Sequence, residues 1–421
     1  MEAIAEYGPV LMTLAMIFGL YMTWGIGAND VANAMGTSVG SGAITVKQAI
    51  IISAIFEFGG AVLAGGTVTE TIRVGIIDTT TIVDRPETLV FGMLAALLAS
   101  AIWLMIASAR GWPVSTTHSI VGALVGFSMA GIGIHAVHWN VVSEIVVSWV
   151  ISPLVGGIIA FLLMLSIRSL ILNTESPFKQ AKKWGPAYVF LVGFITSLIT
   201  MFKGMKHLDI HMTTLESVLL SILIGLLVMA VGKVLINRVE VDEEADRDFY
   251  FASVEKVFTP LMLFTACAMA FAHGSNDVAN GVGPLSAVVS IVQSGGQVAQ
   301  MTPLDVNFLI LGGVGIVIGI ATMGYRVMQT IGTKITELTP TRGFCATLGA
   351  ACTVVLASKT GLPVSTTHVA VGAVMGVGLA RGIGAIDLRV IGGIIVSWVI
   401  TLPAGGLLAA MLYFTLKGIF S

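Results

Sequence analysis

Residues 27 to 34 read Gly-Ala-Asn-Asp-Val-Ala-Asn-Ala, and residues 274 to 280 read Gly-Ser-Asn-Asp-Val-Ala-Asn. The second copy lies 247 residues after the first. Another motif, Pro-Val-Ser-Thr-Thr-His, stands at 113 to 118 and again at 363 to 368, 250 residues later. Two motifs that recur at nearly the same spacing indicate that the chain consists of two related halves.

A third repeat helps to define the extent of these halves. The tetrapeptide Ser-Trp-Val-Ile at 148–151 returns at 397–400, at an offset of 249. The longest polar gaps fall between the copies. We therefore predict a first repeat over 1–172, a linker over 173–256 with two transmembrane helices and charged loops, and a second repeat over 257–421.

The composition of the chain is that of a membrane protein. Hydrophobic residues make up 56% of the sequence, charged residues only 10%, and the mean hydropathy is +0.96. Apolar segments separated by short polar gaps predict an all-α polytopic integral membrane protein of about 12 transmembrane helices. The segments run over 8–28, 45–68, 88–108, 114–134, 140–171, 187–202, 213–236, 258–276, 307–324, 343–358, 364–380 and 390–416.

Several stretches predict irregular backbone inside the membrane. The sequences at 36–45 and 281–290 are too polar or too short to span, so we expect non-helical backbone there, facing a cavity. Asp30 and Asp277 are expected to end or interrupt their helices. The prediction is therefore a fold with interrupted or re-entrant helices, a design found in secondary transporters.

The order of the predicted segments also predicts how the two halves are oriented. Five crossings per half and two in the linker place the second half an odd number of crossings after the first, which makes the repeats inverted. If both termini lie outside, 15 of the 21 Lys and Arg residues fall on the inner side, as the positive-inside rule requires. In such folds the binding site lies near the middle of the membrane, where the halves meet.

Other classes of protein are disfavoured. No Lys or Arg precedes the first apolar stretch, so we expect no cleavable signal peptide. The three cysteines show no spacing typical of zinc sites or disulfide frameworks. A net charge of −2 without a basic tail gives no reason to expect a nucleic-acid partner.

The two Asn-Asp motifs predict a cation site. A carboxylate inside the membrane is costly unless it faces a wet cavity, a cation or a partner, so Asp30 and Asp277 are functional candidates. Amide and carboxylate oxygens are the hard ligands that alkali cations favour. The amides are those of Asn29, Asn33, Asn276 and Asn280. The alternative is that these residues only cap helices.

The Pro-Val-Ser-Thr-Thr-His motifs predict an anion site. Proline at a helix start is followed by free backbone N–H groups and hydroxyl donors, which can bind an oxyanion without Arg or Lys. The hydroxyls belong to Ser115, Thr116, Thr117, Ser365, Thr366 and Thr367. The alternative is that they only bond to carbonyls of the preceding turn.

Three more polar side chains lie in apolar segments. If Gly59-Gly60 is aligned with Gly312-Gly313, the repeat partner of Glu57 is Ile310, so Glu57 is an asymmetric candidate for a cation ligand or proton carrier. Its alternative role is a structural ion pair. We expect His118 and His368 to be hydrogen-bonded packing residues behind the binding groups.

With both copies of each motif, the chain resembles the inorganic phosphate transporter (Pit) family over nearly its whole length. The resemblance implies a cation-coupled phosphate symporter with inverted repeats, and a homodimer. It also implies substrate and cation contacts from the two Asn-Asp motifs and the two Ser-Thr-Thr clusters. Some proteins that resemble this family carry sulfate or use protons, so the resemblance leaves the anion and the coupling ion open.

The sequence therefore predicts a transporter in the cell membrane that imports phosphate by sodium-coupled symport with alternating access. The predicted phosphate-binding residues are Asn29, Ser115, Thr116, Thr117, Asn276, Ser365, Thr366 and Thr367. The predicted sodium ligands are Asp30, Asn33, Glu57, Asp277 and Asn280, and no other cofactor is expected. The nearest alternative is a proton-coupled phosphate or sulfate symporter.

Two alternatives come from other classes. A membrane phosphotransferase could use Ser115 or Ser365 with the nearby His as nucleophile and base. An enzyme has little reason to duplicate its active site in inverted form, so we expect no enzymatic activity. A channel is disfavoured by paired carboxylates deep in a glycine-packed bundle.

Overall fold

The computed structural model describes residues 2–78, 82–83, 85–203, 212–241, 251–298, 304–334, 337–359, 361, 363–382 and 386–420. Within these ranges the chain forms helices and no strand, apart from one isolated bridge between Ile77 and Val137. The first part contains α1 (Glu2–Gly40), α2 (Val46–Ala64), α3 (Gly66–Glu70), α4 (Pro86–Ala109), α5 (Thr116–Gly131) and α6 (Trp139–Ile167). Next come α7 (Pro177–Lys203) and α8 (Thr214–Asn237), followed by α10 (Ala252–Gln293), α11 (Val306–Lys334), α12 (Pro340–Lys359), α13 (Thr366–Arg381) and α14 (Leu388–Phe420).

Each of the twelve apolar segments predicted from the sequence contains one main helix, and 45–68 also includes the start of the short α3, so the all-α polytopic fold is confirmed. The count of about 12 transmembrane helices is not. Nine helices in the described ranges are long and apolar enough to cross a membrane. Helices α5 and α13 have only 16 residues each. At ~1.5 Å per residue each is about 24 Å long, shorter than the hydrocarbon core of a bilayer.

The short helices α5 and α13 belong to two re-entrant hairpins. The residues just before α4 and just after α5 are joined, because the Asp78 amide donates to the Ala136 carbonyl at 2.8 Å and the His138 amide to the Ile76 carbonyl at 2.9 Å. In the other half, Glu337 precedes α12 and pairs at 3.7 Å with Arg381 at the end of α13. Each hairpin thus begins and ends at one end of the bundle, with its Pro-Val-Ser tip inside.

One prediction about the backbone is wrong. Residues 36–40 lie within α1 and residues 281–290 within α10, so neither aspartate interrupts its helix, and of the two stretches only 41–45 is non-helical. In α10 the Ser286 hydroxyl bonds within its own helix, donating to the Gly283 carbonyl at 3.0 Å. The glycines allow close packing, since a Cβ at Gly283 would meet the side chain of Ile72. The breaks occur instead at the two Pro-Val-Ser segments.

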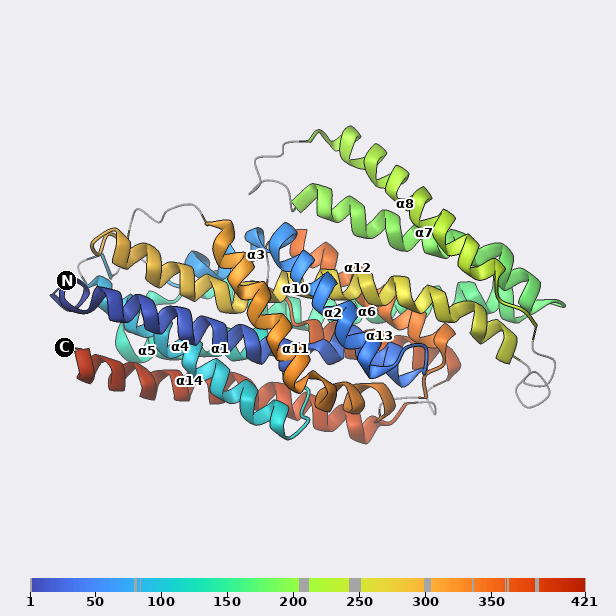
Figure 1. The fold of residues 1–421 in the computed structure, drawn as a ribbon. Coiled ribbons are helices and arrows are strands. Elements are labelled where there is room, and N and C mark those ends of the chain that lie inside the picture. Colours follow the sequence, from blue (N-terminus) through green and yellow to red (C-terminus); the bar gives the residue numbers. More distant parts are fainter. Residues whose placement is uncertain are drawn as a thin grey trace.

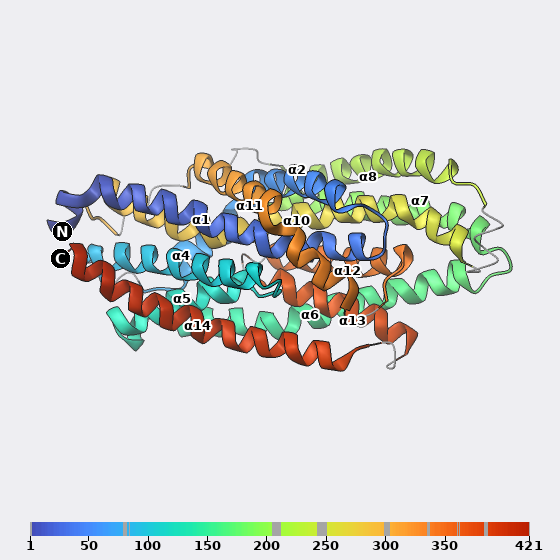
Figure 2. The same ribbon diagram turned by 60° about the horizontal axis from the view of Figure 1, so that its bottom comes forward.

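Helices in corresponding positions of the two halves run in opposite directions. The N- and C-termini lie at the same end of the bundle; α1 runs away from that end, whereas α10 runs towards it (Figures 1 and 2). The same reversal relates α6, which starts near the termini, to α14, which ends there. Helices α7 and α8 form a pair at the side of the bundle (Figure 1).

Candidate functional site

The tips of the two hairpins meet in the middle of the bundle. The Thr117 hydroxyl donates to the Val364 carbonyl at 3.1 Å, and the Thr367 hydroxyl donates to the Val114 carbonyl at 3.2 Å. Each hairpin therefore bonds to the tip of the other in the same way. The N-termini of α5 and α13, with their positive dipole ends, are held close together by this exchange.

Ser115 and Ser365 are the N-caps of these two helices. The Ser115 hydroxyl accepts from the His118 amide at 3.2 Å, and the Ser365 hydroxyl accepts from the His368 amide at 3.3 Å. Serine at this position satisfies one of the free amides of the first turn. The serines thus define where α5 and α13 begin, and the threonines that follow face the centre.

The aspartates of α1 and α10 lie against the threonines of the hairpins. Thr116 donates to Asp30 Oδ2 at 2.6 Å, and Thr366 donates to Asp277 Oδ2 at 2.8 Å. Thr367 also lies 3.5 Å from Asp30 Oδ1, across the boundary between the halves. These contacts bring the two aspartates, far apart in sequence, into one cluster.

The second asparagine of each motif crosses to the opposite half. The Asn33 amide donates to Thr367 at 2.8 Å, and the Asn280 amide donates to Thr117 at 3.3 Å. The site is closed to solvent, because none of the predicted ligands exposes more than 3% of its surface. The first turns of both hairpins and the middles of α1 and α10 thus form one buried polar centre.

The first asparagine of each motif holds a hairpin tip. The Asn29 amide donates to the Trp112 carbonyl at 2.9 Å, and its oxygen accepts from the Val114 amide at 3.1 Å. The Asn276 amide donates to the Val364 carbonyl at 3.0 Å. These bonds fix the backbone of both tips against α1 and α10, so Asn29 and Asn276 position the two hairpin tips.

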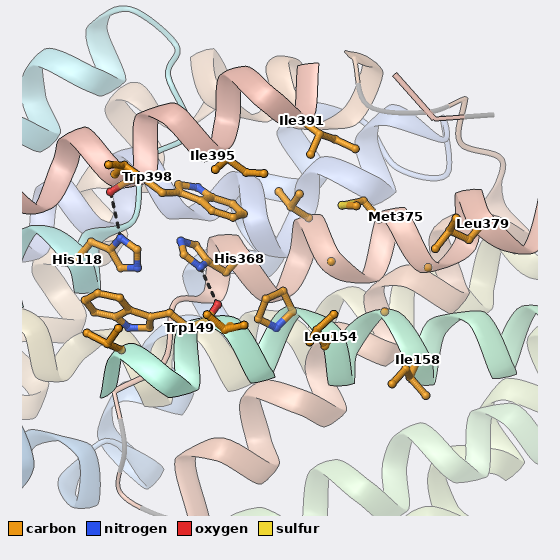
Figure 3. Close-up of a pocket in the computed structure, with 18 of the residues that line it drawn as sticks. His118, Trp149, Leu154, Ile158, His368, Met375, Leu379, Ile391, Ile395 and Trp398 are labelled. Carbon is orange, nitrogen blue, oxygen red and sulfur yellow. Dashed lines mark hydrogen bonds between the residues drawn. The ribbon is translucent and has the colours of Figure 1, made fainter. Parts of the chain in front are cut away.

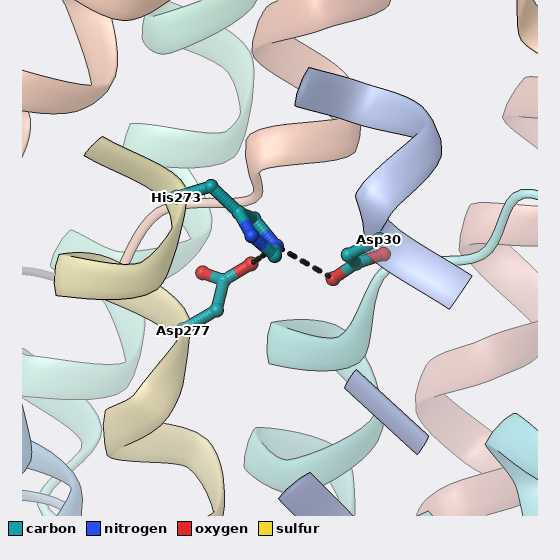
Figure 4. A group of neighbouring side chains, drawn as sticks. All are labelled: Asp30, His273 and Asp277. Carbon is teal, nitrogen blue, oxygen red and sulfur yellow. Dashed lines mark ion pairs between the residues drawn. The ribbon is translucent and has the colours of Figure 1, made fainter. Parts of the chain in front are cut away.

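His273 is a central residue that the sequence reasoning missed. Its Nδ1 lies 2.8 Å from Glu57 Oε2, and its Nε2 lies 2.9 Å from Asp277 Oδ2 and 3.8 Å from Asp30 Oδ2 (Figure 4). The repeat partner of His273 is Ile26, so a search for matching pairs passes over it. Its position four residues before Asp277, on the same face of one helix, was the available signal.

The donors around His273 suit a cation. Asp30, His273 and Asp277 each offer one ligand atom, and these three atoms lie within 4.8 Å of one another. Glu57 Oε1 and Asn280 Oδ1 are buried oxygens without a hydrogen-bond partner in the described structure. Buried oxygens of this kind are costly unless a ligand satisfies them. The centre therefore has both the charge and the unsatisfied oxygens that an alkali cation needs.

The structure corrects the repeat partner of Glu57. A Cβ at Gly274 would meet the backbone oxygen of Glu57, and a Cβ at Gly27 would meet that of Ile316. The close crossing of α10 on α2 therefore corresponds to the crossing of α1 on α11. In this alignment the repeat partner of Glu57 is Ile316 rather than Ile310. Both are apolar, so Glu57, like His273, lies on only one side of the repeat.

His118 and His368 form a symmetric aromatic layer with Trp149 and Trp398 (Figure 3). Their Nδ1 atoms lie 3.3 Å from the Trp398 carbonyl and 3.1 Å from the Trp149 carbonyl. His118 packs on the Trp149 ring at 3.7 Å between centroids, and His368 on the Trp398 ring at 3.5 Å. Together these residues form one wall of a cavity of about 940 Å³ between α6, α13 and α14. They pack and hydrogen-bond behind the threonines, as the sequence predicts.

Comparison with known proteins identifies the family of the chain. The family model described as the phosphate transporter family matches residues 26–409. A protein of Haemophilus influenzae named as a predicted phosphate permease is 50% identical over the full length of both chains. One of Pyrococcus abyssi with the same description is 46% identical, covering 96% of this chain and 97% of its own.

A solved structure is also similar. It is described as the sodium-dependent phosphate transporter and superposes with a TM-score of 0.89 at 40% identity, over 97% of this chain and 100% of its own. The multi-pass helical fold of this chain is therefore that of a membrane transporter. The chain is a transporter rather than an enzyme, and it belongs to the phosphate transporter family.

Proposed function

We propose that the protein imports inorganic phosphate by sodium-coupled symport, with one substrate site built jointly by the two halves. The observation that carries this proposal is the buried centre, in which Asp30 and Asp277 receive hydroxyl hydrogen bonds from Thr116 and Thr366. The acidic groups of this closed site can bind a cation, and the helix N-termini can bind an anion. Such a site suits the transport of sodium and phosphate together.

Sodium binds at the acidic side of this centre. Its ligands are Asp30, Asp277 and Glu57, with the amide oxygens of Asn33 and Asn280. The unpartnered Glu57 Oε1 and Asn280 Oδ1 are available without breaking a hydrogen bond. His273 holds Glu57 and Asp277 in place from the other side.

Phosphate binds between the tips of the two hairpins. The donors are the hydroxyls of Thr116, Thr117, Thr366 and Thr367 and the backbone amides at the starts of α5 and α13. The Ser115 and Ser365 hydroxyls cap these helices, and their amides belong to the same first turns. Asn29 and Asn276 keep both tips in register.

The hydrogen bonds give a physical reason for coupling. In this structure the Thr116 and Thr366 hydroxyls donate to Asp30 and Asp277, so they are not available to an anion. Sodium can satisfy the carboxylates in their place, and each hydroxyl then turns to donate to phosphate. The cation also offsets the repulsion between carboxylates and phosphate. Sodium therefore binds first, and the anion follows.

The transport cycle uses an inverted repeat. We assign 1–172 to the first repeat, 173–256 to the linker with α7 and α8, and 257–421 to the second repeat. The opposite directions of corresponding helices support this assignment (Figure 2). Alternating access then moves one set of helices against the other around the fixed centre. In this assignment the protein is a homodimer in the cell membrane, with both termini outside.

One observation favours a second candidate, a proton-coupled phosphate symporter. Both nitrogens of His273 face carboxylate oxygens, at 2.8 Å and 2.9 Å. A neutral imidazole has one N–H, so this arrangement requires one more proton on the ring or on a carboxylate. The cluster of His273, Glu57 and Asp277 could thus carry a proton instead of sodium.

Uptake of radiolabelled phosphate into proteoliposomes separates the two candidates. The protein is reconstituted under a sodium gradient, a proton gradient or neither. We expect uptake against a concentration gradient only with sodium. Uptake driven by the proton gradient alone would identify the proton, instead of sodium, as the coupling ion. No uptake in any condition would overturn the proposal of phosphate transport.

A further inference from the structure

The polar centre continues along α1 and α12. Thr37 lies one turn beyond Asn33 on α1, and its hydroxyl bonds to the Thr347 hydroxyl of α12 at 2.6 Å. Ser38 is fully buried, and its hydroxyl has no hydrogen-bond partner in the described structure. Thr341, also buried, lies at the start of α12, and its hydroxyl donates to Glu255 Oε2 at 2.8 Å. We call Thr37, Ser38, Thr341 and Thr347 the hydroxyl row.

The same positions in the other direction are apolar. With the offset of 247, Thr37 and Ser38 of α1 correspond to Pro284 and Leu285 of α10. With the offset of 250, Thr341 and Thr347 of α12 correspond to Phe91 and Leu97 of α4. All four counterparts are buried. Other buried serines lie on that side, such as Ser286 on α10 and Ser100 on α4, but at these four matched positions the hydroxyls occur on one side only.

The hydroxyl row leads to a pair of arginines. Arg342 follows Thr341 directly, and the next residue, Gly343, packs against α1 with its Cβ position 3.4 Å from the Thr37 carbonyl. Arg342 and Arg381 both pair with Glu337, at 3.6 Å and 3.7 Å. Glu337 is exposed, so these side chains lie at the surface end of the row. The repeat counterparts of the two arginines are Gly92 and Gly131.

From these observations we infer that phosphate passes between the centre and the end of the bundle away from the termini along the hydroxyl row, with Arg342 and Arg381 at its mouth. The inference rests on the proposed function. Hydroxyls can replace part of the hydration shell of the anion as it moves, which apolar side chains cannot. Two arginines at the mouth attract phosphate and bind its oxygens. Glu337 competes for them and closes the mouth when phosphate is absent.

The row can be tested by cysteine labelling, which does not depend on transport. In a variant with Cys267, Cys345 and Cys352 replaced by Ala, Ser38→Cys is compared with its repeat counterpart Leu285→Cys. Sealed vesicles of both orientations are treated with a membrane-impermeant thiol reagent. The exposed Lys47→Cys and Gln293→Cys, introduced near opposite ends of the bundle, identify the side from which each reaction occurs.

We expect Ser38→Cys to react from the same side as Lys47→Cys, and Leu285→Cys to react at least about tenfold more slowly from the opposite side, because thiol labelling follows exposure. Equal rates for the two, or labelling of Ser38→Cys from the Gln293 side, would overturn the inference. If Ser38→Cys does not fold, Thr347→Cys and Leu97→Cys provide the same comparison on α12 and α4.

Adding sodium phosphate to the medium tests whether phosphate is the ion that occupies the hydroxyl row. We expect it to slow the labelling of Ser38→Cys, whereas sodium sulfate does not. Labelling that is one-sided but insensitive to phosphate would retain the row and overturn phosphate as the transported ion.

A separate experiment tests the two arginines at the mouth of the row. In oriented vesicles, the double substitution of Arg342→Gln and Arg381→Gln should raise the half-saturating phosphate concentration about tenfold on the Lys47 side only, as expected for losing a charge-assisted contact. Arg326→Gln, on α11, is the matched control. An equal change on both sides, or none, would remove the arginines from the path.

Discussion

Asp30 and Asp277 are buried carboxylates that each accept a hydroxyl hydrogen bond and that both lie near His273 Nε2. Replacement of either by Asn keeps the size of the side chain and its ability to accept from threonine, but removes the charge that offsets a cation. We expect Asp30→Asn and Asp277→Asn to fold and to lose sodium-driven phosphate uptake. Near-normal uptake with intact sodium dependence would return these residues to a structural capping role.

In the proposed site, threonine hydroxyls donate hydrogen bonds to the anion. Substitution of Thr116 or Thr366 by Ala should weaken phosphate binding by about 1.5–3 kcal/mol, or roughly tenfold to a hundredfold, as for other hydrogen bonds to charged groups. Thr265→Ala is the control, because this buried hydroxyl only bonds to carbonyls of its own helix. Binding can be measured by calorimetry in saturating sodium. If both variants bind as the parent does, the anion site lies elsewhere.

His273 positions two of the proposed sodium ligands, so its effect should appear in the sodium dependence of uptake. We expect His273→Ala to raise the half-saturating sodium concentration about tenfold, because Glu57 and Asp277 each lose one contact. The repeat partner Ile26 offers a control: Ile26→Ala removes buried volume and should lower thermal stability without changing the sodium dependence. Equal sodium dependence in the two variants would limit His273 to packing.

The residues of the site were predictable to the extent that they are duplicated. Asp30 and Asp277, with the threonines of the two hairpins, follow from motifs that appear twice. His273 could not be found in this way, since Ile26 occupies its place in the first half. Glu57 was recognised from its charge, but its partner was misaligned because glycine pairs recur in both halves and only the helix crossing identifies Ile316.

At the scale of helices, the crossing of α10 on α2 and of α1 on α11 sets the position of the aspartates. A Cβ at Gly274 or Gly27 would overlap a backbone oxygen of the neighbouring helix, so the helices would have to separate. We expect Gly274→Ala and Gly27→Ala each to cost about 1–3 kcal/mol, the usual effect of overpacking. Gly59→Ala meets nothing within 4 Å and serves as the control.

Thermal unfolding in detergent measures these variants. The melting temperature should fall for Gly27→Ala and Gly274→Ala and stay near that of the parent for Gly59→Ala. Equal melting temperatures for the three would contradict the role given to the two crossings.

The apolar segments of the sequence predict where the helices lie, but they do not predict where a helix is interrupted. The stretches around Gly36 and Gly281 look too polar to span, yet they remain helical because neighbouring helices pack closely on them. The break at Pro113 and Pro363 was expected as a helix start. That both breaks form the tips of hairpins, and that the tips bond to each other, depends on contacts between distant segments.

For the whole molecule, the sequence predicts two repeats, and the structure shows corresponding helices running in opposite directions around one centre (Figure 2). The linker helices α7 and α8 lie beside this arrangement (Figure 1). The two halves share the buried centre, since Asn33 and Asn280 each bond to a threonine of the other half, so neither half holds all of the proposed ligands. The molecule should therefore have a single site that requires both halves.

Equilibrium dialysis of the purified protein against radiolabelled phosphate tests this claim most directly, with sodium in one series and choline in the other. The account predicts saturation at one phosphate per chain in sodium and no specific binding in choline. Two phosphates per chain would mean that each half binds on its own. Equal binding in choline would mean that the anion does not depend on the cation, and either result would contradict a shared, sodium-coupled site.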